Sequence, residues 1–342
     1  MEPKMLRTFT YDGIFTLEGG QSLERVEIAY ETYGQLNANK DNVVWVCHAL
    51  TANAAAIEWW PGVVGENTVL DPAKYFIVCA NILGSCYGTT GPLSINPSTG
   101  KPYYYEFPGI TIRDMVKAHI ALKKELGIDH IFLLAGGSMG GYQALEWCMM
   151  EPDAIENLFL IATSASETAW GIAVHEAQRI AIEADDTWQE NHEQAGSKGL
   201  KAARAIGMLT YRNYRVFKQQ QTDTDLSKLD HFKAASYMNY QGDKLVKRFN
   251  AFSYRCLTKA MDTHNIARGR TNMLSAALQE IRQHTFIIGI ESDLLCPTEE
   301  QQLIASHIRD CSLLLIDSDY GHDGFLTESA AINEHLQEWL FP

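Results

Sequence analysis

The chain has 342 residues, of which 46% are hydrophobic and 20% are charged, and its formal net charge is -14. This length is enough for one large domain or two modest ones, and the composition is typical of a soluble globular protein. The acidic charge argues against nucleic acid or an anionic membrane as the main partner, although a local basic pocket could still bind an anionic substrate.

Neither the N-terminal sequence nor the cysteines indicate export. The N-terminal sequence MEPKMLRTFTYDG has no apolar run of signal-peptide length, and the uncharged stretch 131–145 is too short and too rich in glycine to span a bilayer. The seven cysteines are scattered and include no CxxC pair. They predict neither a disulfide framework nor a metal site, and we expect a cytoplasmic protein.

The first half of the chain reads as strands interrupted by helices. Apolar and polar residues alternate in two segments, 7–17 and 24–34, which predicts two strands. Apolar runs of strand length predict four more strands over 43–49, 75–83, 130–137 and 157–165. Apolar residues recur at helical spacing over 111–126, where Thr111 and Asp114 resemble a capping box. A second helix is expected over about 139–150.

The pattern changes after residue 165. Residues 166–278 are more polar and mostly helical, and strand–helix alternation resumes with 285–293, 298–308, 312–324 and 329–340. Alternating strands and helices predict a mostly parallel sheet with helices on both faces. We therefore predict an α/β core formed by 1–165 and 279–342, with an inserted helical lid over 166–278.

One serine stands at a corner of this pattern. Gly136-Gly137-Ser138-Met139-Gly140 fits the motif G-x-S-x-G, with an apolar strand before it and a helix after it. In a nucleophile elbow the serine occupies a strained turn, and side chains at the flanking glycine positions would collide with neighbouring elements. A turn of small residues without chemistry is the alternative, and the context favours the nucleophile.

A serine hydroxyl needs a base to take its proton. The order expected on this kind of sheet is serine, then acid, then histidine, each on a loop at the carboxyl end of a strand. Asp293 ends the strand FIIGIESD, and His322 follows the strand LLLIDSDYGH. Asp317 and Asp319 also follow a strand and are the alternative acids, but we predict the catalytic set Ser138, Asp293 and His322.

The oxyanion formed in acyl transfer needs two backbone N–H donors. We expect one from Met139, which follows the nucleophile, and one from Leu50 in the loop HALTANA after an early strand. His48 lies in the same loop, and we interpret it as a structural hydrogen-bonding residue and not as a second base.

Several longer blocks of the sequence resemble the homoserine O-acetyltransferase family. They run from about Tyr30 to Leu326 and are HALTANA, WWPGVVG, NILGSCYGTTGPLSINPSTGKPY, FPGITIRDMVKAH, GGSMGGYQALEW, NYQGDKLVKRFNAFSYRCLTKAMD, IESDLLCPTEEQ and YGHDGFL. Ordinary esterases share only the serine motif. The resemblance implies an α/β-hydrolase fold with a helical lid, a homodimer formed through that lid, and a role in methionine biosynthesis.

The resemblance also implies a two-step reaction. Ser138 would attack acetyl-CoA, which is a co-substrate and not a bound cofactor, and the hydroxyl of L-homoserine would then take the acetyl group from the serine. Asp293 would hold the imidazole of His322 in its tautomer.

The family places an arginine and a tyrosine early in the lid and an aspartate just after the catalytic histidine. In this chain these are Arg204, Tyr211 and Asp323, which would bind the carboxylate and ammonium of the acceptor. From the residues alone, Arg204 would be read as a solvated helix residue, and Tyr211 could simply pack in the lid.

Some positions leave the substrates open. Ala52 stands where family members usually carry glycine, and Cys296 stands where an aromatic residue is common. The donor could therefore be acetyl-CoA or succinyl-CoA, and the acceptor homoserine or serine. Lys244, Lys247 and Arg248 are candidates for contacts with CoA phosphates, although a solvated helix face is the favoured explanation for them. A serine esterase or thioesterase, and a catalytically silent binding scaffold, are the competing functions.

Overall fold

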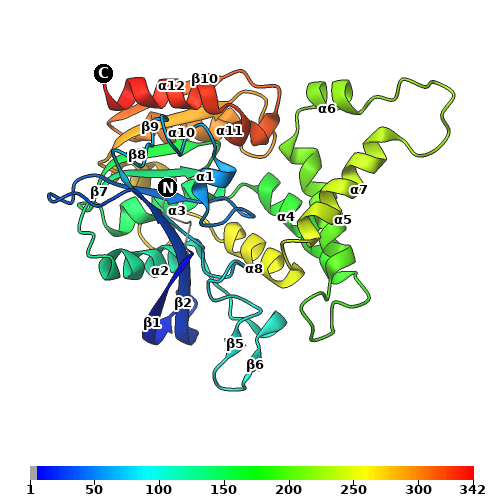
Figure 1. Ribbon diagram of the computed structural model, residues 1–342, viewed down its shortest axis with the longest axis horizontal. Helices are drawn as coiled ribbons and strands as arrows, with labels where there is room; N and C mark the ends of the chain where they lie inside the picture. Colours follow the sequence, from blue (N-terminus) through cyan, green and yellow to red (C-terminus); the bar gives the residue numbers. More distant parts are fainter. Residues whose placement is uncertain (1–5) are drawn as a thin grey trace.

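A computed structural model describes residues 6–342 and has a single eight-stranded sheet at its centre (Figure 1). The strand order is β1-β2-β4-β3-β7-β8-β9-β10. The strands are β1 (Arg7–Thr16), β2 (Ser22–Tyr33), β3 (Val43–Cys47), β4 (Phe76–Ala80), β7 (Ile131–Gly137), β8 (Ile155–Ile161), β9 (His284–Ile290) and β10 (Cys311–Ile316). β1 and β2 form an antiparallel hairpin, β2 pairs antiparallel with β4, and all pairs from β4 to β10 are parallel. The predicted mostly parallel α/β sheet is confirmed.

The parallel strands are apolar along their whole length because both faces of the sheet are covered. All five residues of β3 are buried, and they alternate between two separate cores. Trp45 and Cys47 join the cluster beneath α2 (Ile112–Glu125) and α3 (Met139–Met150), whereas Val44 and Val46 join the cluster beneath α12 (Ser329–Leu340). The expected capping box is present, since the Thr111 side chain accepts from the Asp114 N–H and Asp114 accepts from the Thr111 N–H.

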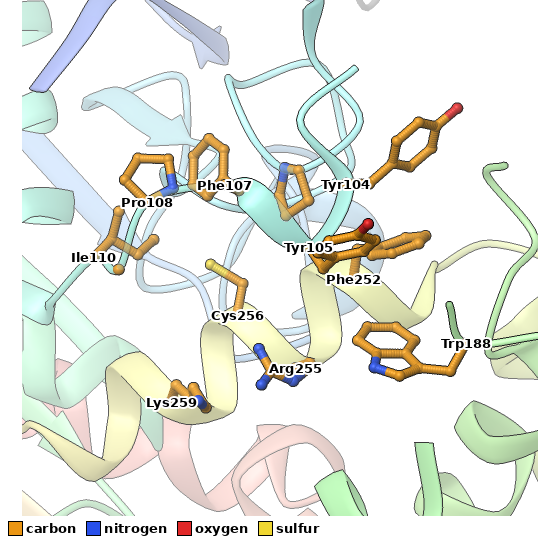
Figure 2. A pocket seen from close by; sticks show the side chains of 12 residues that line it. Tyr104, Tyr105, Phe107, Pro108, Ile110, Trp188, Phe252, Arg255, Cys256 and Lys259 are labelled. Carbon is orange, nitrogen blue, oxygen red and sulfur yellow. The ribbon is translucent and has the colours of Figure 1, made fainter. Parts of the chain in front are cut away.

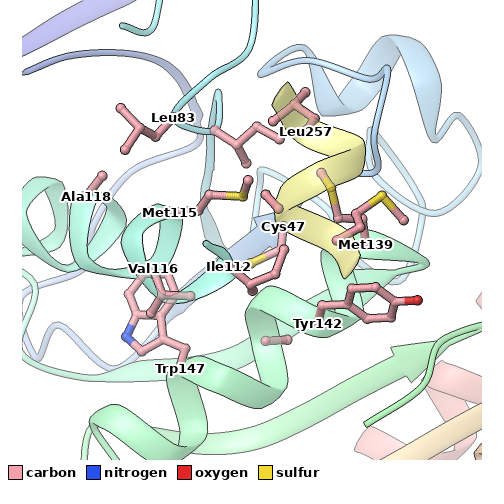
Figure 3. Close-up of a cluster of buried hydrophobic side chains, with 14 of the residues drawn as sticks. Cys47, Leu83, Ile112, Met115, Val116, Ala118, Met139, Tyr142, Trp147 and Leu257 are labelled. Atoms are coloured by element: carbon pink, nitrogen blue, oxygen red, sulfur yellow. The ribbon is translucent and has the colours of Figure 1, made fainter. Parts of the chain in front are cut away.

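Helices α4 to α9 lie between β8 and β9 in the chain. They are α4 (Ala169–Glu183), α5 (Ser197–Tyr211), α6 (Tyr214–Gln221), α7 (Lys233–Val246), α8 (Ala251–Asp262) and α9 (Leu274–Gln279). In Figure 1, α5, α6 and α7 stand to the right of the sheet, while α8 lies closer to it. Figure 3 places Leu257 of α8 beside Met115 and Leu83, within the same buried cluster. The segment 166–278 therefore contains a helix that completes the core, and its division from the core at those boundaries stays a prediction.

Short elements escape the sequence pattern because a period needs several residues to be visible. These are α1 (Ala56–Trp59), the two-residue strands β5 (Ile95–Asn96) and β6 (Lys101–Pro102), the 3₁₀ helices η1 (Tyr104–Glu106) and η2 (Gly321–Asp323), and α11 (Gly324–Thr327). α10 (Thr298–His307) matches its predicted range within one residue. Within residues 6–342, the helices are all too short or too polar to cross a membrane.

Candidate active site

The serine of the motif sits in a strained turn between β7 and α3. Ser138 has φ 53° and ψ −127°, a conformation that costs a non-glycine residue about 1–3 kcal/mol and is found mostly at functional sites. A Cβ at Gly136 would lie 2.3 Å from the Gly140 carbonyl oxygen, and a Cβ at Gly140 would lie 2.1 Å from the Cys47 carbonyl oxygen. Both motif glycines are therefore required by close backbone approaches, which is the physical reason that the sequence analysis assigned to them.

The three predicted catalytic residues meet at the carboxyl edge of the sheet. Ser138 Oγ lies 2.8 Å from His322 Nε2, and His322 Nδ1 lies 2.7 Å from Asp293 Oδ2. Asp293 follows β9, and His322 lies in η2 after β10. The alternative acid Asp319 is half exposed and pairs with Arg215 at 3.2 Å. Asp293 is therefore the carboxylate that contacts the histidine.

Asp293 is held so that it fixes the histidine tautomer. Its Oδ1 accepts hydrogen bonds from the N–H groups of Leu295 (2.7 Å) and Cys296 (2.9 Å), which leaves Oδ2 for His322. Because the carboxylate can only accept, Nδ1 of His322 carries the hydrogen and Nε2 is free to accept the Ser138 proton. Burial would lower the pKa of His322, but the charge and hydrogen bond of Asp293 raise it above the ordinary 6.5.

Of the two expected oxyanion donors, Met139 directly follows the serine and Leu50 lines the same cavity. Met139 is the first residue of α3, and the first four N–H groups of a helix have no partner within the helix. Leu50 lines the same cavity as Ser138. The side chain of Gln143 braces these two segments, because its Nε2 donates to the carbonyls of His48 and Met139, both at 3.1 Å.

His48 is a structural residue in this geometry. It is fully buried, and burial lowers its pKa to about 4, so the ring is neutral. Its Nδ1 lies 2.8 Å from the Ala49 carbonyl oxygen, and its Nε2 accepts from the Ile82 N–H at 3.2 Å. Nε2 therefore fastens the loop after β3 to the residues that follow β4, whereas Nδ1 makes a contact within the loop.

Ser138 and His322 open into a cavity of about 610 Å³. Its walls also include Leu50, Arg204, Tyr211 and Asp323, so the predicted acceptor residues face the same space as the nucleophile. The Arg204 guanidinium carbon lies 5.2 Å from the centre of the Tyr211 ring, and that ring lies 5.9 Å from the ring of His322. Burial raises the pKa of Tyr211, so its phenol stays protonated near neutral pH and can donate a hydrogen bond.

Arg212 belongs to this site and is missing from the sequence analysis. Its Nε lies 3.1 Å from Asp323 Oδ2. Burial raises the pKa of Asp323, and the positive charges of Arg212 and Arg204 oppose that effect. The position of Arg212 directly after Tyr211 was visible in the sequence, but spacing alone does not reveal which carboxylate a cation at a helix end will meet.

A second missed residue, His175 of α4, forms part of the cavity wall. It is buried, and its Nδ1 lies 2.9 Å from Asp262 Oδ1 at the end of α8. Arg179, one turn further along α4, donates to the other oxygen of Asp262. These contacts join two inserted helices under the cavity. A histidine and an arginine four residues apart on a helix carry no sequence signal for this role.

Asp293, Cys296 and His322 are the described residues that could hold a metal ion, since their ligand atoms lie within 4.8 Å of one another. Asp293 and His322 are already bonded to each other. Burial raises the pKa of the Cys296 thiol well above its usual value, whereas a metal ligand must be the thiolate. The donor set fits a hydrogen-bonded catalytic pair better than a metal centre.

The contact between Asp293 and His322 predicts a measurable titration. We expect NMR titration of His322 to give a pKa above 6.5, and Asp293→Asn to lower that pKa, since the charge and hydrogen bond of Asp293 are the largest effects that oppose burial. Labelling of Ser138 by a fluorophosphonate needs neutral His322. In Asp293→Asn, the midpoint of the pH profile of the labelling rate should therefore move to lower pH, and the maximal labelling rate should fall by about 10⁴-fold.

The matched control is Asp319→Asn, which removes an exposed carboxylate after the same strand as His322. An Asp293→Asn variant with an unchanged or higher His322 pKa would contradict this account of the site.

Comparisons with known proteins agree with this geometry. A family described as having the alpha/beta hydrolase fold matches residues 42–329. A homoserine O-acetyltransferase from Cyclobacterium marinum is 50% identical over 313 residues, which cover 92% of this chain and 89% of that protein.

Two solved structures share the fold over nearly the whole chain. Homoserine O-acetyltransferase from Bacillus anthracis has a TM-score of 0.93 at 24% identity and covers 100% of this chain and 99% of that one. Esterase E22 has a TM-score of 0.90 at 25% identity and covers 98% of this chain and 100% of that one. The resemblance noted in the sequence blocks is confirmed, and the chain belongs to the homoserine O-acetyltransferase family of α/β-hydrolase-fold proteins.

Proposed function

We propose that this protein transfers the acetyl group of acetyl-CoA to the hydroxyl of L-homoserine through an acetyl-Ser138 intermediate. The observation that carries the proposal is the combination, in one cavity, of the Ser138–His322 pair with a guanidinium and a carboxylate from Arg204 and Asp323. The opposite charges of this pair match the carboxylate and ammonium of a free amino acid. The 50% identical relative named homoserine O-acetyltransferase supports the choice of substrates.

In the first half-reaction, Ser138 Oγ attacks the thioester carbonyl carbon while His322 Nε2 accepts its proton. The N–H groups of Met139 and Leu50 stabilise the oxyanion of the tetrahedral intermediate. The carbon–sulfur bond then breaks, and His322 returns the proton to the CoA sulfur. The products of this step are free CoA and acetyl-Ser138.

In the second half-reaction, His322 Nε2 accepts the proton of the homoserine hydroxyl as that oxygen attacks the acetyl carbon of Ser138. The bond from the acetyl carbon to Ser138 Oγ breaks, and the proton goes back to Ser138. Asp293 stabilises the imidazolium in both steps, since its Oδ2 lies 2.7 Å from Nδ1. The enzyme is thereby restored.

Binding of the acceptor decides between transfer and hydrolysis. Arg204 would pair with the homoserine carboxylate, Asp323 with its ammonium, and the phenol of Tyr211 would donate to the carboxylate or the reacting oxygen. Two ionic contacts fix both ends of the amino-acid group, so the hydroxyl arm has one direction in which to extend. Holding the hydroxyl in position favours its attack on the acyl-serine over attack by water.

Two alternatives remain within the same chemistry. Succinyl-CoA as donor, or L-serine as acceptor, would use the same catalytic residues. A serine esterase is the alternative from another class. The TM-score of 0.90 with esterase E22 supports this alternative, since a protein with the same fold is named an esterase. An esterase has no need for the Arg204 and Asp323 pair.

We also propose that the protein is a homodimer formed through α5, α6 and α7. Large apolar side chains are exposed there, namely Leu209, Tyr214, Leu226, Leu229, Phe232 and Tyr240. Leu226 and Leu229 are 97% and 94% exposed in the segment between α6 and α7, which stands away from the sheet (Figure 1). Monomeric proteins rarely expose so many apolar residues in one region, so a second copy covering this region is the simplest explanation.

Thiol release from acetyl-CoA should depend on L-homoserine. We expect rapid release with homoserine, little release without it, and slower reactions with succinyl-CoA or with L-serine. Ser138→Ala should abolish both turnover and covalent acetylation seen by mass spectrometry, whereas Ser236→Ala, at an exposed serine of α7, should behave as the parent. Equal release without any acceptor would favour the esterase, and acetylation of the Ser138→Ala variant would contradict the mechanism.

Arg204→Ala should raise the KM for homoserine while leaving acetylation of Ser138 unchanged. The loss of a charge-assisted contact is worth about 1.5–3 kcal/mol, or roughly a 10- to 100-fold rise in KM. Arg215→Ala is the matched control, because its side chain is 74% exposed and pairs with Asp319. An unchanged KM in Arg204→Ala would remove this residue from the acceptor site.

Leu226→Glu combined with Leu229→Glu should convert the dimer to a monomer in analytical ultracentrifugation. Both side chains are almost fully exposed in one chain, so the substitutions should not disturb folding. Ile14→Glu on β1, which is 69% exposed, controls for the added charge. A parent protein that sediments as a monomer, or a double variant that stays dimeric, would refute assembly through this segment.

A further inference from the structure

A second cavity lies on the side of α8 that faces the long connection between β4 and α2 (Figure 2). Its volume is about 190 Å³. Five of its twelve lining residues are aromatic, namely Tyr104, Tyr105, Phe107, Trp188 and Phe252. The ring of Phe252 lies 5.3 Å from that of Tyr104 and 4.9 Å from that of Trp188, and Figure 2 shows Trp188 beside Arg255. The cavity is smaller than the roughly 300–1,000 Å³ typical of drug-sized ligands, so it suits a single ring system.

The charges of this cavity are all positive. Arg255 and Lys259 come from the same face of α8, and the described residues that line the cavity include no carboxylate. Arg255 Nε donates to Glu183 at 2.6 Å and its guanidinium lies 5.8 Å from the Trp188 ring, which leaves its other N–H groups for a further acceptor. Within residues 6–342, no carboxylate pairs with Lys259. Arg255 therefore lies over an aromatic ring, and Lys259 adds a second positive charge to the same cavity.

This cavity and the catalytic cavity are joined by one segment of chain. Lys244 and Arg248 line the catalytic cavity, and Phe252, Arg255 and Lys259 line the second one. Arg248 and Phe252 are four residues apart, so their Cα atoms are separated by at most about 14 Å.

Arg248 is exposed, as the sequence predicted, and it also has defined hydrogen-bond partners. It donates to the Tyr87 hydroxyl at 2.6 Å and to the Thr51 carbonyl, at the mouth of the catalytic cavity. Basic side chains therefore extend from the mouth of the catalytic cavity to the aromatic one.

We propose that the aromatic cavity binds the adenosine 3′-phosphate end of the acyl-CoA donor. A purine ring is planar and stacks on aromatic side chains, and a phosphate is matched by a guanidinium and an ammonium. Arg255 and Lys259 contact the 3′-phosphate, Tyr105 and Trp188 flank the adenine, and Lys244 and Arg248 contact the diphosphate nearer the catalytic cavity. The pantetheine arm then extends toward Ser138.

This assignment rests on the proposed use of an acyl-CoA donor, and it adds a site outside the catalytic cavity. It also explains why α8 carries basic residues on the face opposite its buried one, where Tyr254 and Leu257 pack into the core. A donor anchored by its nucleotide can be recognised without any contact to the acyl group.

The test compares two donors that differ only in the nucleotide. In Arg255→Gln with Lys259→Gln, we expect the KM for acetyl-CoA to rise at least about 10-fold with kcat unchanged, and the KM for S-acetylpantetheine, which lacks the nucleotide, to stay the same. Tyr105→Ala should also raise the KM for acetyl-CoA alone. Lys74→Gln is the control, because it removes the charge of an exposed lysine that lines neither cavity.

Free adenosine 3′,5′-bisphosphate distinguishes the CoA end from an independent nucleotide site. It should compete with acetyl-CoA in the parent protein, and its binding measured by calorimetry should weaken about 10-fold or more in the double variant. An unchanged KM for acetyl-CoA, an equal rise in KM for both donors, or binding that does not compete with acetyl-CoA would overturn the assignment. Absence of thiol release from both donors in the parent protein would instead contradict the proposed function, and calorimetry would still test the cavity.

Discussion

The close approach of backbone segments at Ser138 is the constraint on which the rest of the site depends. The loop after β3 passes so near to α3 that a Cβ at Gly140 would lie 2.1 Å from the Cys47 carbonyl oxygen. This approach brings the segment of Leu50 beside the first N–H groups of α3, where an oxyanion would form. At this corner Ser138 has a positive φ of 53°, and its Oγ lies 2.8 Å from His322 Nε2. The strain at one residue is supported by buried contacts on both sides, including those of Gln143 and His48.

The core and the inserted helices supply different parts of the chemistry. Loops at the carboxyl ends of β7, β9 and β10 carry the nucleophile, the acid and the base, and their geometry is determined by the sheet. Arg204 and Tyr211 come from α5, whereas Asp323 lies in η2 beside His322. The Tyr211 ring lies 5.9 Å from that of His322, and Arg212 after α5 pairs with Asp323. Gly321, directly before His322, has φ +63°, and a Cβ there would lie 2.9 Å from the Asn213 N atom. The end of α5 and the loop of the catalytic histidine are thus packed as one unit, so acceptor binding and proton transfer share a rigid support.

Sequence reasoning predicted the sheet and the three catalytic positions because both depend on local patterns. Buried parallel strands are apolar throughout, and an elbow demands glycines at set positions, so each is visible without knowledge of distant contacts. Arg212 and His175 were missed because their roles depend on partners 111 and 87 residues away, Asp323 and Asp262, which no spacing rule identifies. The lid boundary is hard to place for the same reason, since α8 looks like the other inserted helices yet buries Leu257 in the core.

This protein shares its fold with esterase E22, so the choice between acyl transfer and hydrolysis must depend on local features of the site and not on the fold. The acyl-serine and the base are the same in both reactions, so the triad alone cannot favour one acceptor over another. Water is present at far higher concentration than any amino acid, and an acceptor must therefore offset that excess by being held in place. In this chain the groups able to hold a zwitterion are charged residues around the cavity, Arg204 and Asp323, with Arg212 opposing the rise in the pKa of Asp323 that burial causes. In this chain, the side chains able to favour an amino acid over water are therefore these few ions beside Ser138 and His322.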